Sequence, residues 1–321
     1  MNKYIIHNKR VLIPYLVMVP FMALSSTLFA QAMEPLFDTA ILREGRDLLF
    51  LALVFMGLGL IDMFFYYLHK ICRERLRSEF LIGLKKDIFA GILNMDIGVF
   101  QKESPASYIS LIQRDVKTIN SNYFDSVCGI YRVTVSFIFT VIALSMINPW
   151  ICLMNLLVAF TSVFLPRVFG KKIEKASRTA SQNADAYQNV ISDALLGFST
   201  IKLFSISKKM EQQVDKRNIE NEKSEYQSKK LNFSVSYISI MCSQLGYMLT
   251  LFLGIIFVLY GKMSIGGVVA ISQLIGGVLA PFEELPEFMT NLKSVKVIIA
   301  KVNKVIVRSS HIGEKEEKEL E

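Results

Sequence analysis

The chain has 321 residues, 52% of them hydrophobic, and its mean hydropathy is +0.39. This is more apolar side chain than the core of one soluble domain of that size normally buries, which argues against a soluble globular protein. The net charge of +8 fits a nucleic-acid partner or a membrane surface, and the placement of the charges along the chain decides between the two.

The apolar residues are gathered into six blocks, each long enough for a helix to cross the hydrocarbon core of a bilayer, which takes about 20 residues. Backbone N–H and C=O groups in lipid must be paired within the segment, so these blocks are expected to be helical. We therefore predict an all-α membrane protein with six transmembrane helices at residues 11–32, 48–68, 127–147, 150–168, 233–260 and 265–292.

The first block has a second interpretation, because Lys3, Lys9 and Arg10 precede an apolar run in the way that a cleavable signal peptide begins. The run is longer than the hydrophobic region of such peptides and contains Pro14 and Pro20. A retained first helix is therefore the favoured interpretation.

The basic residues lie almost entirely on one side of the predicted spans. Of 36 Lys and Arg residues, only Arg43, Arg46 and Lys262 fall in the connections after the first, third and fifth spans, while Arg132 lies inside a span. By the positive-inside rule the basic side is the cytoplasm. We predict a multi-pass protein of a bacterial plasma membrane with both termini cytoplasmic. Mixed charge in residues 208–230 indicates a solvated helix face, and no nucleic-acid partner is expected.

Two long segments on the basic side, between spans two and three and between spans four and five, keep apolar residues at helical spacing between charges. A continuous helix from Trp150 to Leu196 would measure about 70 Å, against a hydrocarbon core of about 30 Å. Spans two to five are thus expected to extend as helical stalks. The chain can turn back at residues 101–105 and 196–199, and a short helix is expected at each turn, where a cytoplasmic partner would make contact.

Charged residues inside spans are costly, so Asp62 and Arg132 are candidate functional residues. Both are predicted in the inner half of the membrane, where they either pair with each other or face a hydrated cavity, with substrate contact as a further possibility. Gln31, Asn155, Gln244 and Gln273 either line a pathway or form interhelical hydrogen bonds. The candidate cavity residues are Asp62, Arg132, Gln244, Gln273, Glu283 and Glu287; Glu284 is a further candidate in the same part of the last span, and helical spacing places Glu283 and Glu287 on one face.

No residue pattern in the chain predicts a cofactor or metal site. The four cysteines, Cys72, Cys128, Cys152 and Cys242, have no Cys-x-x-Cys spacing, and the three histidines are dispersed. A phosphate-binding loop needs glycine five residues before a Gly-Lys pair, and Ile256 holds that position before Gly261-Lys262. We expect no enzymatic activity from this chain alone.

Three segments resemble the transmembrane domain of ABC exporters, a family of six-helix half-transporters. They are residues 95–119, with MDIGVF and RDVKTI; residues 192–204, SDALLGFSTIKLF; and residues 261–270, GKMSIGGVVA, followed by APF at 280–282. The resemblance implies one transmembrane domain at residues 1–307, followed by a charged linker or tail at 308–321.

The resemblance also implies two coupling helices that dock on nucleotide-binding domains. Their residues are Glu103, Ser104, Pro105, Ala106, Ser107 and Tyr108 in the first, and Gly197, Phe198, Ser199, Thr200, Ile201, Lys202, Leu203 and Phe204 in the second. ATP and Mg²⁺ would act through those domains, and a second transmembrane domain, identical or different, would complete the transporter.

The predicted function is that of the membrane-spanning part of an ATP-driven exporter that moves an unknown substrate by alternating access. The main alternative is a membrane scaffold or immunity-type protein that retains this architecture without transport. A channel is less favoured because the chain has long stalks and no filter-like segment. An intramembrane enzyme is disfavoured because no catalytic constellation is found.

Overall fold

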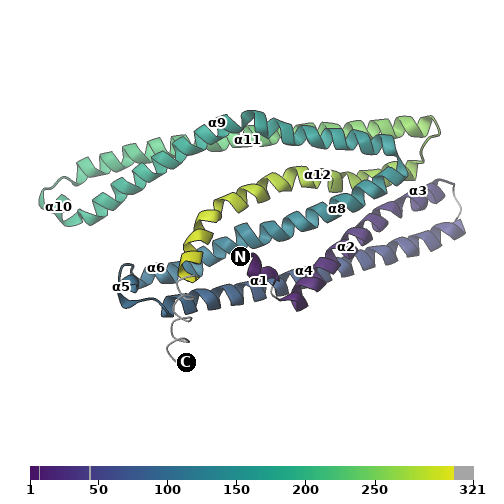
Figure 1. Ribbon diagram of the computed structural model, residues 1–321. Helices are drawn as coiled ribbons and strands as arrows, with labels where there is room; N and C mark the ends of the chain where they lie inside the picture. Colours follow the sequence, from purple (N-terminus) through teal and green to yellow (C-terminus); the bar gives the residue numbers. More distant parts are fainter. Residues whose placement is uncertain (7, 43–44, 307–321) are drawn as a thin grey trace, which may run out of the picture. The chain divides into compact units, whose positions relative to one another are not determined.

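The computed structural model describes the backbone of residues 1–6, 8–42 and 45–306; the side chains of residues 2, 6, 42, 45, 46, 161–168 and 239 lie outside that description. Within this part of the chain the structure is almost entirely helical and contains no strand, which confirms the all-α prediction. The elements are α1 Asn2–Ile6, α2 Lys9–Gln31, α3 Met33–Leu42, α4 Gly45–Leu93, α5 Ile97–Phe100, α6 Pro105–Ser110, η1 Leu111–Asp115, α7 Val116–Ile119, η2 Asn120–Phe124, α8 Asp125–Ile147, α9 Pro149–Leu196, α10 Phe198–Leu203, α11 Ser207–Leu259 and α12 Ile265–Ser294 (Figure 1).

The chain divides into two compact units. Met1–Leu156 together with Leu249–Glu321 form the first, which we call the bundle unit, and Leu157–Met248 form the second, which we call the hairpin unit. The predicted single domain at residues 1–307 stays a prediction, and the predicted tail at 308–321 lies outside the described residues.

Five helical segments of the described chain are long and apolar enough to cross a membrane: Lys9–Ile41, Asp47–Leu93, Pro105–Ile147, Ser207–Leu259 and Ile265–Ser294. The sixth predicted span, residues 150–168, is described only up to Phe160, as a shorter apolar helix, since the side chains that follow are outside the description. The structure therefore supports five spans, and the sixth stays a prediction.

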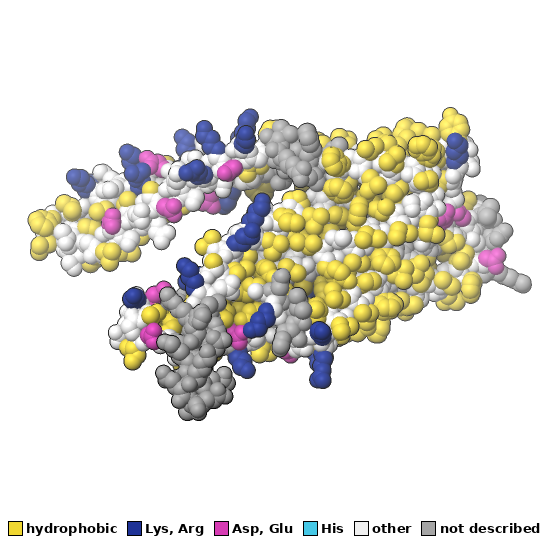
Figure 2. All heavy atoms as spheres, in the orientation of Figure 1, with side chains coloured by type: hydrophobic (Ala, Val, Ile, Leu, Met, Phe, Trp, Pro, Cys, Tyr) yellow, Lys and Arg dark blue, Asp and Glu magenta, His cyan; other side chains and the backbone are white. Residues whose placement is uncertain are grey.

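The bundle unit is built mainly on α2, α4, α8 and α12, with α2 packed on α4 and α8, and α12 packed on α8 and α3. Its core is a cluster of buried apolar side chains that includes Phe80, Leu84, Ile119 and Phe124. On the face drawn in Figure 2, hydrophobic side chains cover the middle of this bundle, whereas Lys and Arg lie toward the end that carries α5 and α6. An exposed apolar surface of this kind is expected where lipid, not water, is the solvent.

The connection after the first span differs from the expected outer loop, because residues 33–42 form helix α3. Its acidic side chains hold the start of α12: the Gly266 N–H donates to Asp38 Oδ1 at 2.8 Å, and Ser264 Oγ donates to Glu34 Oε1 at 3.3 Å. A carboxylate near the first N–H groups of a helix pairs a donor that has no partner inside the helix. These contacts hold α3 against the start of α12.

The long helices predicted from the sequence are present. Helix α4 has 49 residues, α9 has 48 and α11 has 53, so each is about 70–80 Å long at 1.5 Å per residue. In the hairpin unit the end of α9 leads into the short helix α10 and back into α11 (Figure 1). Helix α9 ends at Leu196, and Ser205 adopts a positive φ of 54° as the chain turns into α11.

Candidate functional site

A polar cavity of about 660 Å³ lies inside the bundle unit, and four helices contribute its walls. We call it the polar cavity. Its lining residues are Met22, Ala23, Ser26, Thr27, Phe29 and Ala30 of α2; Asp62, Tyr66, His69, Lys70 and Arg73 of α4; Arg132, Ser136 and Thr140 of α8; and Gln273, Leu274 and Gly277 of α12.

Helix α4 contributes a regular stripe of polar residues to this wall. Asp62, Tyr66, His69 and Arg73 follow one another at intervals of four, three and four residues, the spacing that places side chains on one face of a helix. Lys70, next to His69, joins them, with its Nζ 5.3 Å from the centre of the Tyr66 ring. Charged groups in an apolar span are costly, which makes this stripe a candidate functional surface.

Close contacts at small residues set the position of α12 against α8. A Cβ added at Gly277 would collide with the Thr140 hydroxyl, and one added at Gly129 would collide with the Phe288 ring. Pro281, buried between these contacts, and Pro286 lie inside α12, which curves in Figure 1. Proline removes a backbone hydrogen bond and bends a helix, so α12 can follow the cavity wall.

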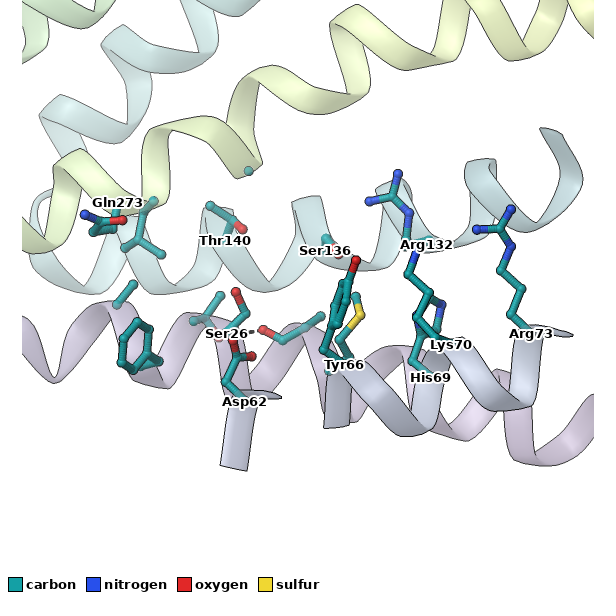
Figure 3. A pocket seen from close by; sticks show the side chains of 17 residues that line it. Ser26, Asp62, Tyr66, His69, Lys70, Arg73, Arg132, Ser136, Thr140 and Gln273 are labelled. Atoms are coloured by element: carbon teal, nitrogen blue, oxygen red, sulfur yellow. Dashed lines mark hydrogen bonds between the residues drawn. The ribbon is translucent and has the colours of Figure 1, made fainter. Parts of the chain in front are cut away.

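Three of the six predicted cavity residues come together here. Asp62, Arg132 and Gln273 all line the polar cavity, each from a different helix (Figure 3). Asp62 and Arg132 do not form the ion pair that was one of two predicted arrangements. Arg132 Nη2 instead lies 2.6 Å from Glu284 Oε2, and Asp62 Oδ1 accepts a hydrogen bond of 2.9 Å from Ser25 Oγ. Helix α12 brings a carboxylate to Arg132, and α2 brings a donor to Asp62, so each finds a partner elsewhere.

The other three predicted residues do not line this cavity. Gln244 is exposed on α11 in the hairpin unit, and Glu283 and Glu287 are exposed on α12. Glu284 is the acidic residue of α12 that faces α8, because it shares a face with Gly277, Pro281 and Phe288 at spacings of four, three and four.

The uncharged polar residues proposed for a pathway include two that hold helices together. Gln31 Nε2 donates to the Ala143 carbonyl at 3.3 Å, and Asn155 Oδ1 accepts from Thr250 Oγ1 at 3.2 Å. Both are hydrogen bonds between helices, the second of the two interpretations that the sequence left open. The four cysteines are free thiols, and no cluster of three or more metal-ligating side chains occurs among the described residues.

Several lining residues were not identified from the sequence, namely Ser26, Tyr66, His69, Lys70, Arg73, Ser136 and Thr140. His69 is the most unusual of them: its side chain is 1% exposed, and neither ring nitrogen has a hydrogen-bond partner in the described part of the protein. The helical spacing from Asp62 to Arg73 was a signal that would have found this stripe.

Short helices occupy both predicted turns. The first turn contains α5 and α6, and the second contains α10, which begins after Gly197. Ser104 caps α6, with its Oγ accepting from the Ser107 N–H at 3.3 Å, and Pro105 occupies the first helical position. Helix α6, at residues 105–110, thus begins two residues later than the predicted coupling helix, and the docking role of both turns stays a prediction.

The model of the ABC transporter transmembrane region matches residues 11–282 of this chain. Similar proteins include the mitochondrial potassium channel ATP-binding subunits of Mus musculus and Rattus norvegicus, which are 25% and 24% identical over 246 residues. That stretch covers 74% of this chain and 31% and 32% of theirs. An ABC transporter ATP-binding protein of Bacillus subtilis, YfiC, is 18% identical over 213 residues, which cover 66% of this chain and 35% of that protein.

The chain therefore spans about a third of the length of these curated relatives. The match covers the apolar helices, the turn with α5 and α6, and α10, and it ends within α12. With this match over most of its length and five apolar helices long enough to span a bilayer, the chain is a multi-pass membrane protein that belongs to the family of ABC transporter transmembrane regions.

Proposed function

We propose that this chain is the membrane-spanning part of an ATP-driven exporter, which moves its substrate by alternating access under the control of nucleotide-binding domains. Family membership supports a transport role, and the names of the similar proteins include ATP-binding subunits. ATP and Mg²⁺ would bind to the nucleotide-binding domains, and a second transmembrane domain would complete the pathway. The protein would lie in a bacterial plasma membrane with α5, α6, α10 and both termini in the cytoplasm, as the positive-inside rule predicts.

The observation that carries this proposal is the apolar tip of the hairpin unit. The side chains of Phe198, Leu203 and Phe204 at the α10 turn are 58%, 81% and 67% exposed, in a segment whose long helices carry many charged residues. Large exposed apolar groups at the end of a long polar helix pair mark a surface that another protein covers. A nucleotide-binding domain with an apolar groove is the partner we infer for it.

The length of the helices supports the mechanical part of the proposal. Helices α4, α9 and α11 are each more than twice as long as the hydrocarbon core is thick. A displacement of α10 by a nucleotide-binding domain is therefore transmitted to the membrane segment along continuous helices. ATP shifts the equilibrium between the two states only by binding one of them more tightly.

The test is ATP hydrolysis by the chain reconstituted in lipid vesicles with its nucleotide-binding domain, supplied as a separate polypeptide (the nucleotide-binding polypeptide). We expect the double substitution Phe198→Ser and Leu203→Ser to lower the stimulated ATPase rate about tenfold or more, because each buried apolar anchor contributes about 1.5–3 kcal/mol to docking. Ile219→Ser is the matched control, since Ile219 is an equally exposed apolar residue on α11 away from the tip.

If the wild-type chain leaves the ATPase rate of the nucleotide-binding polypeptide unchanged, a coupled exporter is excluded and a non-transporting scaffold is favoured. If Ile219→Ser lowers the rate as much as the tip variant does, the docking surface is not α10. Correct assembly of each variant is checked by size-exclusion chromatography before the assay.

A further inference from the structure

The basic side chains of the polar cavity gather at one of its ends. In Figure 3, His69, Lys70, Arg132 and Arg73 lie together, Asp62 lies farther along, and Gln273 lies at the opposite end. Asp62 and Lys70 are eight residues apart on α4, about 12 Å along the helix axis. We call the group of His69, Lys70, Arg73 and Arg132 the basic end.

The two arginines of the basic end are partly neutralised. Arg73 Nη2 lies 2.6 Å from Asp125 Oδ1, and Arg132 Nη2 lies 2.6 Å from Glu284 Oε2. A guanidinium has five N–H donors, so each pair leaves donors to spare. The Arg73 Nε is buried and has no hydrogen-bond partner in the described structure.

His69 and Lys70 have no such compensation. Neither nitrogen of the buried His69 ring has a hydrogen-bond partner among the described residues; the ring packs beside Tyr15, with 5.7 Å between the ring centres. Lys70 has no carboxylate within ion-pair distance in the same part of the chain. A buried polar group without a partner is costly, and most such groups in proteins are paired. The basic end therefore combines the half-buried, unpaired charge of Lys70 with the unused donors of a buried His69 ring.

The cavity wall on the side of α2 is partly apolar. Met22, Ala23, Phe29 and Ala30 line it there beside Ser26 and Thr27, with Leu274 from α12. A ligand that satisfies both parts has an anionic head, with oxygen atoms that accept hydrogen bonds, and an apolar body. Phosphate and carboxylate oxygens are the acceptors that arginine and lysine pair with most strongly.

We propose that the basic end of the polar cavity binds the oxyanion, phosphate or carboxylate, of an amphiphilic molecule, with Lys70 and the spare Arg73 and Arg132 donors as its charge partners and His69 as a hydrogen-bond donor. As a statement about the cargo, this rests on the proposed transport function. The binding site itself is a property of the bundle unit and is testable without ATP.

The experiment measures equilibrium binding of radiolabelled dodecyl phosphate to the full chain in phosphatidylcholine nanodiscs, with empty nanodiscs subtracted. Unlabelled inorganic phosphate, dodecanol and dodecyltrimethylammonium serve as competitors. We expect unlabelled dodecyl phosphate to displace the label at concentrations at least tenfold lower than any of the three require. Equal competition by inorganic phosphate would overturn the amphiphile part and leave a free anion as the ligand. Equal or stronger competition by dodecyltrimethylammonium would overturn the anion site.

Lys70→Gln and His69→Phe are each expected to weaken binding about tenfold, the effect of losing one charge-assisted or buried hydrogen bond. His69→Phe keeps a ring beside Tyr15, and Lys70→Gln removes no ion pair, so both variants should fold. Lys86→Gln is the matched control, since Lys86 is an exposed lysine of α4 outside the cavity. Equal affinities for Lys70→Gln, Lys86→Gln and wild type would overturn the site.

The two proposals fail in different ways. Loss of ATPase coupling with intact dodecyl phosphate binding would reject the exporter and keep the binding site. Coupled ATP hydrolysis without any binding of dodecyl phosphate would reject this inference and keep the exporter.

Discussion

The bundle unit and the hairpin unit use the same secondary structure but hold it together differently. The bundle unit has local ion pairs such as Arg77 with Glu74, but also pairs between residues far apart in the chain, as Arg132 with Glu284 and Lys301 with Asp115 are. The ion pairs found in the described hairpin residues are local, as Arg217 with Glu220 at 2.8 Å is. Local pairs stiffen one helix, whereas distant pairs fix helices relative to one another.

The difference follows the tasks that we infer for the two units. A cavity keeps its shape only if the helices around it are held in place, and the bundle unit does this with ion pairs between helices and with close contacts at Gly129, Gly266 and Gly277. The hairpin unit, if it transmits movement from α10 to the membrane, needs only continuous helices and a tip that a partner can cover. The tip carries exposed apolar residues, Phe198, Leu203 and Phe204, which contribute little to the stability of the isolated chain.

The largest expected contrast between the units is at their glycines. A Cβ at Gly266, in the bundle unit, would collide with the backbone carbonyl of Glu34, whereas a Cβ at Gly170, in the hairpin unit, would have no atom within 4 Å. Gly266→Ala should lower the free energy of unfolding by about 1–3 kcal/mol, because backbone atoms cannot move aside as a side-chain end can. Gly170→Ala should raise it by about 0.5–1 kcal/mol through lower chain entropy and better helix propensity.

The measurement is thermal unfolding in one detergent for both variants and wild type. Opposite shifts of the midpoint are expected. Two shifts of the same sign would contradict the idea that α3 and α12 are packed tightly at Gly266 while α9 is open at Gly170.

A second contrast compares a long-range ion pair with a local one. In a double-mutant cycle of Arg132→Gln and Glu284→Gln, we expect a coupling energy of about 1–2 kcal/mol, since the pair is a charge-assisted hydrogen bond that is only about a third exposed. In the cycle of Lys229→Gln and Glu225→Gln, a clearly smaller coupling energy is expected, because this i,i+4 pair lies on one helix and is exposed to solvent. Both coupling energies are measured by chemical unfolding in mixed micelles. Equal values would contradict the idea that the long-range pair stabilises the fold more than the local pair does.

Much of the fold was predictable because its signals are local. Apolar blocks of about 20 residues predicted the five spans that the structure supports, and a stretch from Trp150 to Leu196 with Pro166 as its one proline predicted the long helix α9, which is 48 residues long. Both turns were found from Pro105 and Gly197, since these residues start or interrupt helices. The place of helix α3 was not predicted, because it is set by the contacts of Glu34 and Asp38 with the start of α12, a segment more than 200 residues away.

The cavity was only half predictable, because charge in a span identifies a candidate residue but not its partner. Asp62 and Arg132 were found from their cost in lipid, yet the pairing of Arg132 with Glu284 depends on which face of α12 meets α8. Glu283 and Glu287 have the same side chain as Glu284, and they differ from it only in the face of α12 on which they lie. Helical spacing places Glu284 on the same face as Gly277, Pro281 and Phe288. Treating the small residues as helix contacts would have predicted that this face of α12 meets α8.

The smallest expected contrast is between the two turns. In the first, the Phe100 and Tyr108 rings are stacked, with 4.9 Å between their centres and 5° between their planes, and Tyr108 is buried. In the second, Phe198 is 58% exposed and its ring has a Lys202 Nζ at 5.7 Å. The first turn is thus stabilised by its own aromatic pair, whereas the second leaves its ring for a partner.

Phe100→Ala should therefore lower the free energy of local opening of the first turn by about 0.5–1 kcal/mol, the contribution of an aromatic pair. Phe198→Ala should lower that of the second turn by less than about 0.5 kcal/mol. Hydrogen exchange of the isolated chain in nanodiscs measures this directly, because local opening sets the exchange rate of the amides in each turn. We expect exchange across residues 97–110 to rise about twofold to fivefold in Phe100→Ala, and exchange across residues 197–205 to be nearly unchanged in Phe198→Ala. When the nucleotide-binding polypeptide is added, the second turn should become protected in wild type and stay unprotected in Phe198→Ala. Protection of the second turn in the isolated chain would mean that α10 is already covered, and its exposed ring could then not be the docking surface.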